Sequence, residues 1–197
     1  FSYEKEKEIL KGIDLIVPSN GLVSLVGVSG CGKSTIASLL CGKNKGYTGE
    51  IKIGGKNLNE LEASELLSHI TVVRHNSYLF KGTVEENLKM ANDKASVSMM
   101  EEALKKVNLY EFFNTQEGIR TKLSERAGNL SGGQCQRFAI ARALLHDTPI
   151  YIFDEATSNI DAESEELIME VIKELAKTKT ILLISHRLSN VVTSNCI

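Results

Sequence analysis

The stretch "GVSGCGKS", from Gly27 to Ser34, combines residue types that bind phosphate. It has the spacing G-x-x-x-x-G-K-[ST], in which glycines let the backbone wrap closely so that several N–H groups point at one anion. A helical stretch follows, and a helix N-terminus adds its positive dipole end. Lys33 can place a point charge on the β- and γ-phosphates, and the Ser34 hydroxyl is a suitable Mg²⁺ ligand. The alternative is a chance glycine-rich turn, but a buried strand before the loop and a helix after it favour a phosphate loop (P-loop). The predicted phosphate-binding residues are Gly27, Val28, Ser29, Gly30, Cys31, Gly32, Lys33, Ser34 and Thr35.

Two carboxylates follow the apolar run "IYIF" and form a second candidate site. A buried strand would deliver Asp154 and Glu155 to the carboxyl edge of the sheet, where ligands of α/β proteins bind. Asp154 is predicted to orient the Mg²⁺ shell, and Glu155 to align or deprotonate an attacking water. Taken alone, the pair would more simply be surface carboxylates, and the P-loop is what favours a site.

A third feature, "NLSGGQCQR", opens another helix with Ser131, Gly132 and Gly133. This N-terminus also suits phosphate, yet it carries no lysine and lies far along the chain from the P-loop. Two phosphate-directed helix ends suggest that each ATP is shared between chains. The alternative is an ordinary glycine-rich N-cap.

Buried strands alternate with helices along the chain, an order typical of a mostly parallel α/β sheet. Strands are expected at 12–17, 22–26, 70–73, 150–153 and 179–185, and helices at 34–41, 60–69, 131–145 and 161–178. A helical pattern from Thr83 to about Leu123 indicates an insertion. Within it, Thr83 with Glu86 and Ser98 with Glu101 have capping-box spacing.

Composition excludes several classes of protein. The 197 residues suit one domain with a subdomain, and 23 basic against 25 acidic residues give a net charge of −2. This balance offers no electrostatic argument for nucleic acid. The four cysteines lack the close pairing of a zinc site and fit a reducing compartment. No apolar run approaches the ~20 residues of a membrane span. A start at Phe1 suggests a domain of a longer protein.

The order of these motifs resembles the ABC-transporter ATPase family. "LSGGQ" stands between the P-loop and "DEATS", "VVRHN" occupies the place of the glutamine-bearing loop, and "SNID" and "SHR" follow in order. The resemblance implies an α/β fold: a P-loop NTPase core with a mostly parallel sheet, an N-terminal antiparallel β subdomain and an inserted α-helical subdomain. The core would comprise residues 1–75 and 136–197, and the helical signature subdomain residues 76–135.

The family also implies roles for individual residues. Tyr3 would stack on adenine, and His186 would contact the γ-phosphate and align the water with Glu155. In a head-to-tail dimer, the signature residues would touch the partner's ATP; they are Ser131, Gly132, Gly133 and Gln134. The segment 158–161 would meet the partner subunit. ATP and Mg²⁺ are the implied cofactors, with Ser34 and Asp154 as metal-site residues.

His75 stands where the family has a glutamine that reaches Mg²⁺ and senses the membrane domain. Imidazole cannot donate and accept through one planar amide as glutamine does, and Mg²⁺ prefers oxygen. One hypothesis is that His75 keeps this coupling role through hydrogen bonding; the other is that it is simply solvated. Part of the neighbouring run Tyr78, Leu79 and Phe80 is expected to be exposed, because the family docks its membrane domain there.

Several details resemble exporters: Ala156 in "DEATS", "SHRLS" near the end, and Glu125 in "TKLSERAG", although Ser124 and Ala127 replace usual glycines. The resemblance therefore implies the ATP-hydrolysing motor domain of a membrane exporter fused to its own transmembrane permease domain. It would work as a dimer with a second ATPase domain at the cytoplasmic face of the membrane, without nucleic acid. The alternatives are an ATP-binding subunit with impaired hydrolysis and a non-transport ABC ATPase.

Overall fold

The computed structural model describes residues 1–4 and 7–187 and contains a four-stranded parallel sheet in the order β3-β10-β9-β6. Its strands are β3 (Gly21–Val26), β6 (Ile70–Arg74), β9 (Ile150–Asp154) and β10 (Thr180–Ser185). Because all four run the same way, their carboxyl ends share one edge. Arg74 pairs with Asp154 in register, and Asp154 with Ile184. The expected parallel sheet is confirmed.

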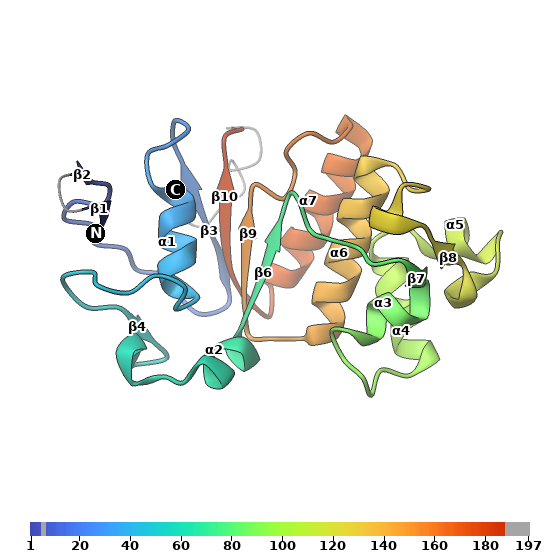
Figure 1. The fold of residues 1–197 in the computed structure, drawn as a ribbon, viewed down its shortest axis with the longest axis horizontal. Coiled ribbons are helices and arrows are strands. Elements are labelled where there is room, and N and C mark those ends of the chain that lie inside the picture. The colour runs from blue at the N-terminus through green and yellow to red at the C-terminus, as the bar shows by residue number, and fades with distance from the viewer. Residues whose placement is uncertain (5–6, 188–197) are drawn as a thin grey trace.

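Helices cover both faces of this sheet (Figure 1). They are α1 (Lys33–Leu40), α2 (Ala63–His69), α6 (Gly132–His146) and α7 (Ala162–Ala176). Alternate residues of β10 point to opposite faces: Leu183 joins the core formed with α6 and α7, and Leu182 joins the core formed with α1 and α2. Burial on both faces explains why these strands are almost continuously apolar.

Small antiparallel sheets and short helices complete the described fold. The strand pairs are β1 (Ser2–Glu4) with β2 (Lys7–Glu8), β4 (Lys52–Ile53) with β5 (Lys56–Asn57), and β7 (Gly82–Thr83) with β8 (Lys122–Leu123). The inserted helices are α3 (Val84–Lys89), α4 (Val97–Lys106) and α5 (Tyr110–Asn114), and the 3-10 turns are η1 (Leu58–Glu60), η2 (Gly118–Arg120) and η3 (Glu125–Ala127). Figure 1 places α3 to α5 beyond α6, at the end opposite β1 and β2. The boundaries of the predicted subdomains stay a prediction.

Two local predictions were wrong. Residues 12–17 form no strand, and Ile13, Leu15 and Ile16 are exposed there. A strand needs a ladder partner for its N–H and C=O groups, and none of the described strands lies alongside this segment. Helix α4 is capped by Ser96, which accepts from Met99 N, rather than by Ser98. By contrast, the capping box of Thr83 and Glu86 is confirmed at α3.

Among residues 1–4 and 7–187, no helix has the length and apolar character needed to cross a bilayer.

Candidate functional site

The loop between β3 and α1 is folded around the ammonium group of Lys33. Lys33 Nζ donates to the backbone oxygens of Gly27 at 2.8 Å and Val28 at 2.9 Å, and the side chain is buried. Gly32 precedes α1 with φ 102°, and a Cβ there would lie 2.6 Å from Leu10 Cδ2. A larger residue would therefore be both strained and crowded. The glycine is required by the path of the backbone that encloses the lysine.

The N-terminus of α1 and the end of β9 bring Ser34 and Asp154 into contact across 120 residues of sequence. Ser34 Oγ donates to Asp154 Oδ1 at 2.8 Å, and the Asp154 side chain is buried. A hydroxyl and a carboxylate beside a phosphate loop are the hard oxygen donors that Mg²⁺ prefers. Among the described residues, no group of three or more His, Cys, Asp or Glu side chains is arranged to hold a metal ion. The donor set therefore suits an ion that takes its other ligands from phosphates and water.

Glu155 and His186 form a second pair at the same edge. Glu155 Oε1 lies 2.6 Å from His186 Nε2, and both side chains are accessible. Glu155 has φ 54°, a left-handed conformation uncommon outside glycine, and its backbone N–H donates to Ile184 O at 3.0 Å. Such strain at a carboxylate is typical of functional sites. The bend carries the carboxylate out of the strand direction and toward the histidine.

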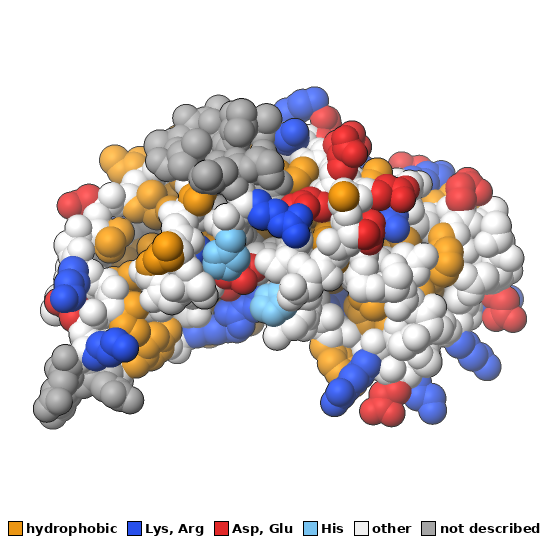
Figure 2. All heavy atoms as spheres, turned by 90° about the horizontal axis from the view of Figure 1, so that it is seen from above, with side chains coloured by type: hydrophobic (Ala, Val, Ile, Leu, Met, Phe, Trp, Pro, Cys, Tyr) orange, Lys and Arg blue, Asp and Glu red, His pale blue; other side chains and the backbone are white. Residues whose placement is uncertain are grey.

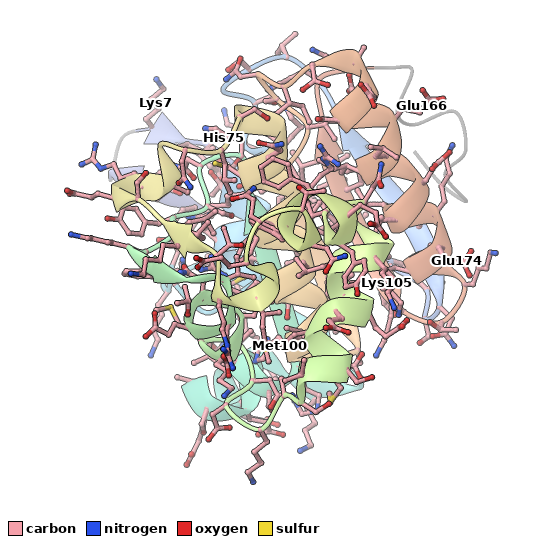
Figure 3. All side chains as sticks on the ribbon, turned by 90° about the vertical axis from the view of Figure 1, so that its right-hand side faces the viewer. Lys7, His75, Met100, Lys105, Glu166 and Glu174 are labelled. Atoms are coloured by element: carbon pink, nitrogen blue, oxygen red, sulfur yellow. The ribbon has the colours of Figure 1, made fainter. Side chains whose placement is uncertain are left out.

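His75 follows β6 and is exposed, in a turn that begins where the strand ends. Within residues 1–4 and 7–187, no hydrogen bond to its imidazole is found. In Figure 3, His75 lies toward the upper edge of the view, far from Met100 of α4. Figure 2 shows histidine, acidic and basic side chains close together near the middle of the face seen from above. The structure therefore puts His75 on the face that carries the site, without a protein partner among those residues.

The neighbouring aromatic run is divided between surface and core. Tyr78 and Phe80 are exposed, with ring centroids 4.8 Å apart, while Leu79 is buried. The prediction that part of this run is exposed is confirmed. That a membrane domain docks there stays a prediction.

The signature segment is capped by its own side chains. Ser131 Oγ accepts from Gln134 N at 3.1 Å, and Gln134 Oε1 accepts from Ser131 N at 2.8 Å. Ser131 and Gly132 are exposed, whereas Gly133 is buried and packs against α7. Behind the segment, burial raises the pKa of the Cys135 thiol, whose Sγ faces Ala127 O at 3.8 Å. The segment presents a helix N-terminus to the outside of the chain.

Other predicted residues lie around these groups. Tyr3 is exposed, and its hydroxyl donates to Thr35 Oγ1 at 3.4 Å, which places the ring beside α1. Asp161 caps α7: the Ser164 backbone N–H donates to its Oδ1 at 2.8 Å, which holds the pKa of Asp161 below its ordinary value. The exposed residues of the P-loop are Val28, Ser29, Gly30, Cys31 and Ser34.

Sequence reasoning missed two residues of the site. Arg74 Nε lies 3.7 Å from Asp154 Oδ2, and Gln136 Nε2 donates to Arg74 O at 3.0 Å. One signal in the sequence could have indicated Arg74. It is a basic residue at the end of a strand that was predicted to lie in the same sheet as Asp154. Nothing local signals Gln136, because its contact joins residues 62 positions apart.

The fold and the site together define a P-loop nucleotide-binding domain, and comparisons with known proteins identify its family. The family model described as ABC transporter matches residues 10–158. An uncharacterized ABC transporter ATP-binding protein of Haemophilus influenzae is 48% identical over 197 residues, which are 100% of this chain and 35% of that protein. The ATP-dependent lipid A-core flippase of Pectobacterium atrosepticum is 44% identical over 194 residues, 97% of this chain and 33% of the flippase.

A solved structure agrees with these sequence relatives. The structure of a bacterial Atm1-family ABC exporter with ATP bound superposes with a TM-score of 0.91 at 36% identity, over 99% of this chain and 34% of that chain. The chain belongs to the ABC transporter family. It is an ATP-binding domain of the exporter type. It spans about a third of the length of the relatives it matches.

Proposed function

We propose that this chain binds Mg²⁺-ATP and hydrolyses it as the motor domain of a membrane exporter. One observation carries the proposal. The pairs Ser34–Asp154 and Glu155–His186 lie at the sheet edge that also carries the loop around Lys33. ABC transporter ATP-binding domains have ATPase activity in general, and the arrangement provides each group that such a reaction needs.

The binding half of the reaction rests on Lys33, Ser34 and Asp154. Loop N–H groups and the N-terminus of α1 would bind the phosphates, and the Lys33 ammonium would turn from the Gly27 and Val28 carbonyls to phosphate oxygens. Ser34 and Asp154 would hold Mg²⁺. When bound there, the ion supplies positive charge that neutralises the phosphate oxygens. Tyr3, exposed beside α1, would stack on adenine.

The hydrolytic half rests on Glu155 and His186. A carboxylate aimed out of the strand end can accept a proton from water, or hold that water in line with the γ-phosphorus. His186 Nε2 lies 2.6 Å from Glu155 Oε1, so it would orient the carboxylate and contact the γ-phosphate. His75 takes the place of the family's glutamine and acts by hydrogen bonding at the edge of the site. Its accessible imidazole leaves a second candidate, a subunit with slow hydrolysis.

The signature residues act on a second ATPase domain in a head-to-tail dimer. Ser131 and Gly132 are exposed, and no heavy atom lies within 4 Å of a Cβ built at Gly132, which supports action on another chain's nucleotide. The proposed partner is an ATPase domain of the same kind, in a homodimer or a heterodimer. Closure of the dimer on ATP would drive a transmembrane permease domain, and the exposed Tyr78 and Phe80 are the proposed contact with it. The domain would then work at the cytoplasmic face of the membrane.

Replacing the proposed catalytic carboxylate tests this function. In the complete protein, Glu155→Gln should lower steady-state ATP hydrolysis by about a hundredfold or more, because proton acceptance and water alignment are lost together. The ATP affinity, measured by equilibrium binding, should stay near that of the parent protein. Glu174→Gln, an exposed carboxylate of α7 paired with Lys177, is the matched control and should retain the parent rate. Equal rates for Glu155→Gln and the parent would refute the assignment.

A further inference from the structure

Arg74 brings a positive charge to the proposed metal site. It is the last residue of β6 and pairs in register with Asp154, the last residue of β9. Its Nε lies 3.7 Å from Asp154 Oδ2, while Ser34 Oγ donates to the other carboxylate oxygen at 2.8 Å. The two oxygens of Asp154 therefore face different groups, a hydroxyl on one side and a cation on the other.

Arg74 and Asp154 interact through their charges and not through a hydrogen bond. A separation of 3.7 Å is longer than an N–H···O hydrogen bond. Arg74 Nε is buried and has no hydrogen-bond partner within the described chain, although 37% of the side chain is exposed. The direction of the Asp154 carboxylate is already fixed by Ser34. Arg74 thus contributes mainly an electrostatic field at Oδ2.

The backbone of Arg74 is held from two sides. Its carbonyl oxygen accepts from Gln136 Nε2 at 3.0 Å and from Ser77 Oγ at 2.9 Å. Gln136 is buried in α6, the helix that begins with the signature segment, and Ser77 belongs to the turn that contains His75. The position of the charge is therefore set by a rigid strand end that is joined to α6 and to the His75 turn.

Charge competition follows from this geometry. Lys33 is directed at carbonyl oxygens of its own loop, and Arg74 is the cation paired with Asp154 in the described part of the chain. A divalent cation bound at Asp154 would share that carboxylate with the guanidinium, and like charges this close repel strongly in a partly buried site. We propose that Arg74 is a positioning residue that holds Asp154 as an internal counter-ion and thereby weakens the affinity of the site for a divalent metal ion. This inference rests on the proposed function.

Metal affinity can be measured without turnover. In the complete protein carrying Glu155→Gln, Mn²⁺ would be titrated at saturating ATP and free Mn²⁺ followed by electron paramagnetic resonance. Arg74→Gln is expected to tighten Mn²⁺ binding on the order of tenfold, the scale of effects from residues around metal ligands. Arg74→Lys keeps the charge and should lie close to the parent. Arg120→Gln, an exposed arginine of η2, is the control for loss of a positive charge and should change nothing.

A second titration separates the outcomes. ATP affinity would be measured with EDTA present, so that no divalent ion contributes. Equal metal-free affinities for parent and Arg74→Gln, together with tighter Mn²⁺ binding in the variant, support the proposal. Unchanged or weaker Mn²⁺ binding in Arg74→Gln overturns it, as does weaker metal-free ATP binding, which would make Arg74 a phosphate ligand. A parent protein that binds neither ATP nor Mn²⁺ would instead refute the proposed function.

Discussion

Helices α1 and α6 both have glycine at their N-termini: Gly32 is the N-cap of α1, and Gly132 is the first residue of α6. The contacts at the two N-termini differ. At α1, Lys33 is buried and Ser34 is bonded to Asp154, a residue of another strand. At α6, the side chains of Ser131 and Gln134 each accept from the backbone N–H of the other in a capping box. The first N-terminus contacts groups from another strand of its own chain, whereas Ser131 and Gly132 at the second are exposed.

This difference indicates what each glycine does. At the P-loop, Gly32 allows the backbone to turn beneath Leu10 and enclose the lysine. In the signature, Gly132 faces open space, while a Cβ on Gly133 would lie 2.1 Å from Ser164 Oγ and 2.7 Å from Asp161 Oδ2. Adjacent glycines of one motif therefore have separate roles, one toward the outside and one toward α7.

Substituting alanine at each signature glycine in turn would separate these roles. Gly133→Ala should have the largest effect on stability. Gly133→Ala is expected to lower the free energy of unfolding by about 2 kcal/mol, because α6 and α7 must move apart to accept the methyl group. Gly132→Ala is the matched variant and should leave the unfolding temperature unchanged, since no atom lies within 4 Å of the added Cβ. Thermal unfolding of the complete protein measures both. Equal losses would show that the two glycines are equivalent.

A smaller effect is expected at His75, which is exposed in the turn after β6. Glutamine can donate and accept through one planar amide, whereas imidazole has no amide oxygen. His75→Gln should therefore raise the rate of ATP hydrolysis by up to about tenfold, the worth of one modest hydrogen bond. Steady-state ATPase rates of the parent and the variant in the complete protein measure this. Equal rates would favour a solvated side chain.

Local patterns predicted the parts of the site that depend on a short stretch of chain. The P-loop, the carboxylates after β9 and the Thr83 capping box are each specified within a few residues, and the parallel sheet follows from the alternation of buried strands with helices. The expected strand at 12–17 did not form, because a strand depends on a neighbour and not only on its own apolar residues.

Contacts between distant segments were beyond the sequence. The pairing of Arg74 with Asp154 depends on strand order, which the alternation of elements does not give. The start of α4 at Val97 was missed by two residues, because Ser96 and Ser98 are both residues that can cap a helix. Ala127 has φ 50° at a position where the sequence comparison with the family expected glycine. A residue with a Cβ disfavours this left-handed conformation.

The central claim is that this chain holds its own ATP at the P-loop and completes another chain's site with its signature. The most direct test measures ATP affinity at equilibrium and ATP hydrolysis for Lys33→Ala and Ser131→Arg in the complete protein. Lys33→Ala removes the buried ammonium and should weaken ATP binding by about a hundredfold. Ser131→Arg should abolish hydrolysis while ATP affinity stays within about threefold of the parent, a difference below 1 kcal/mol. ATP affinity lost equally in both variants would contradict the account.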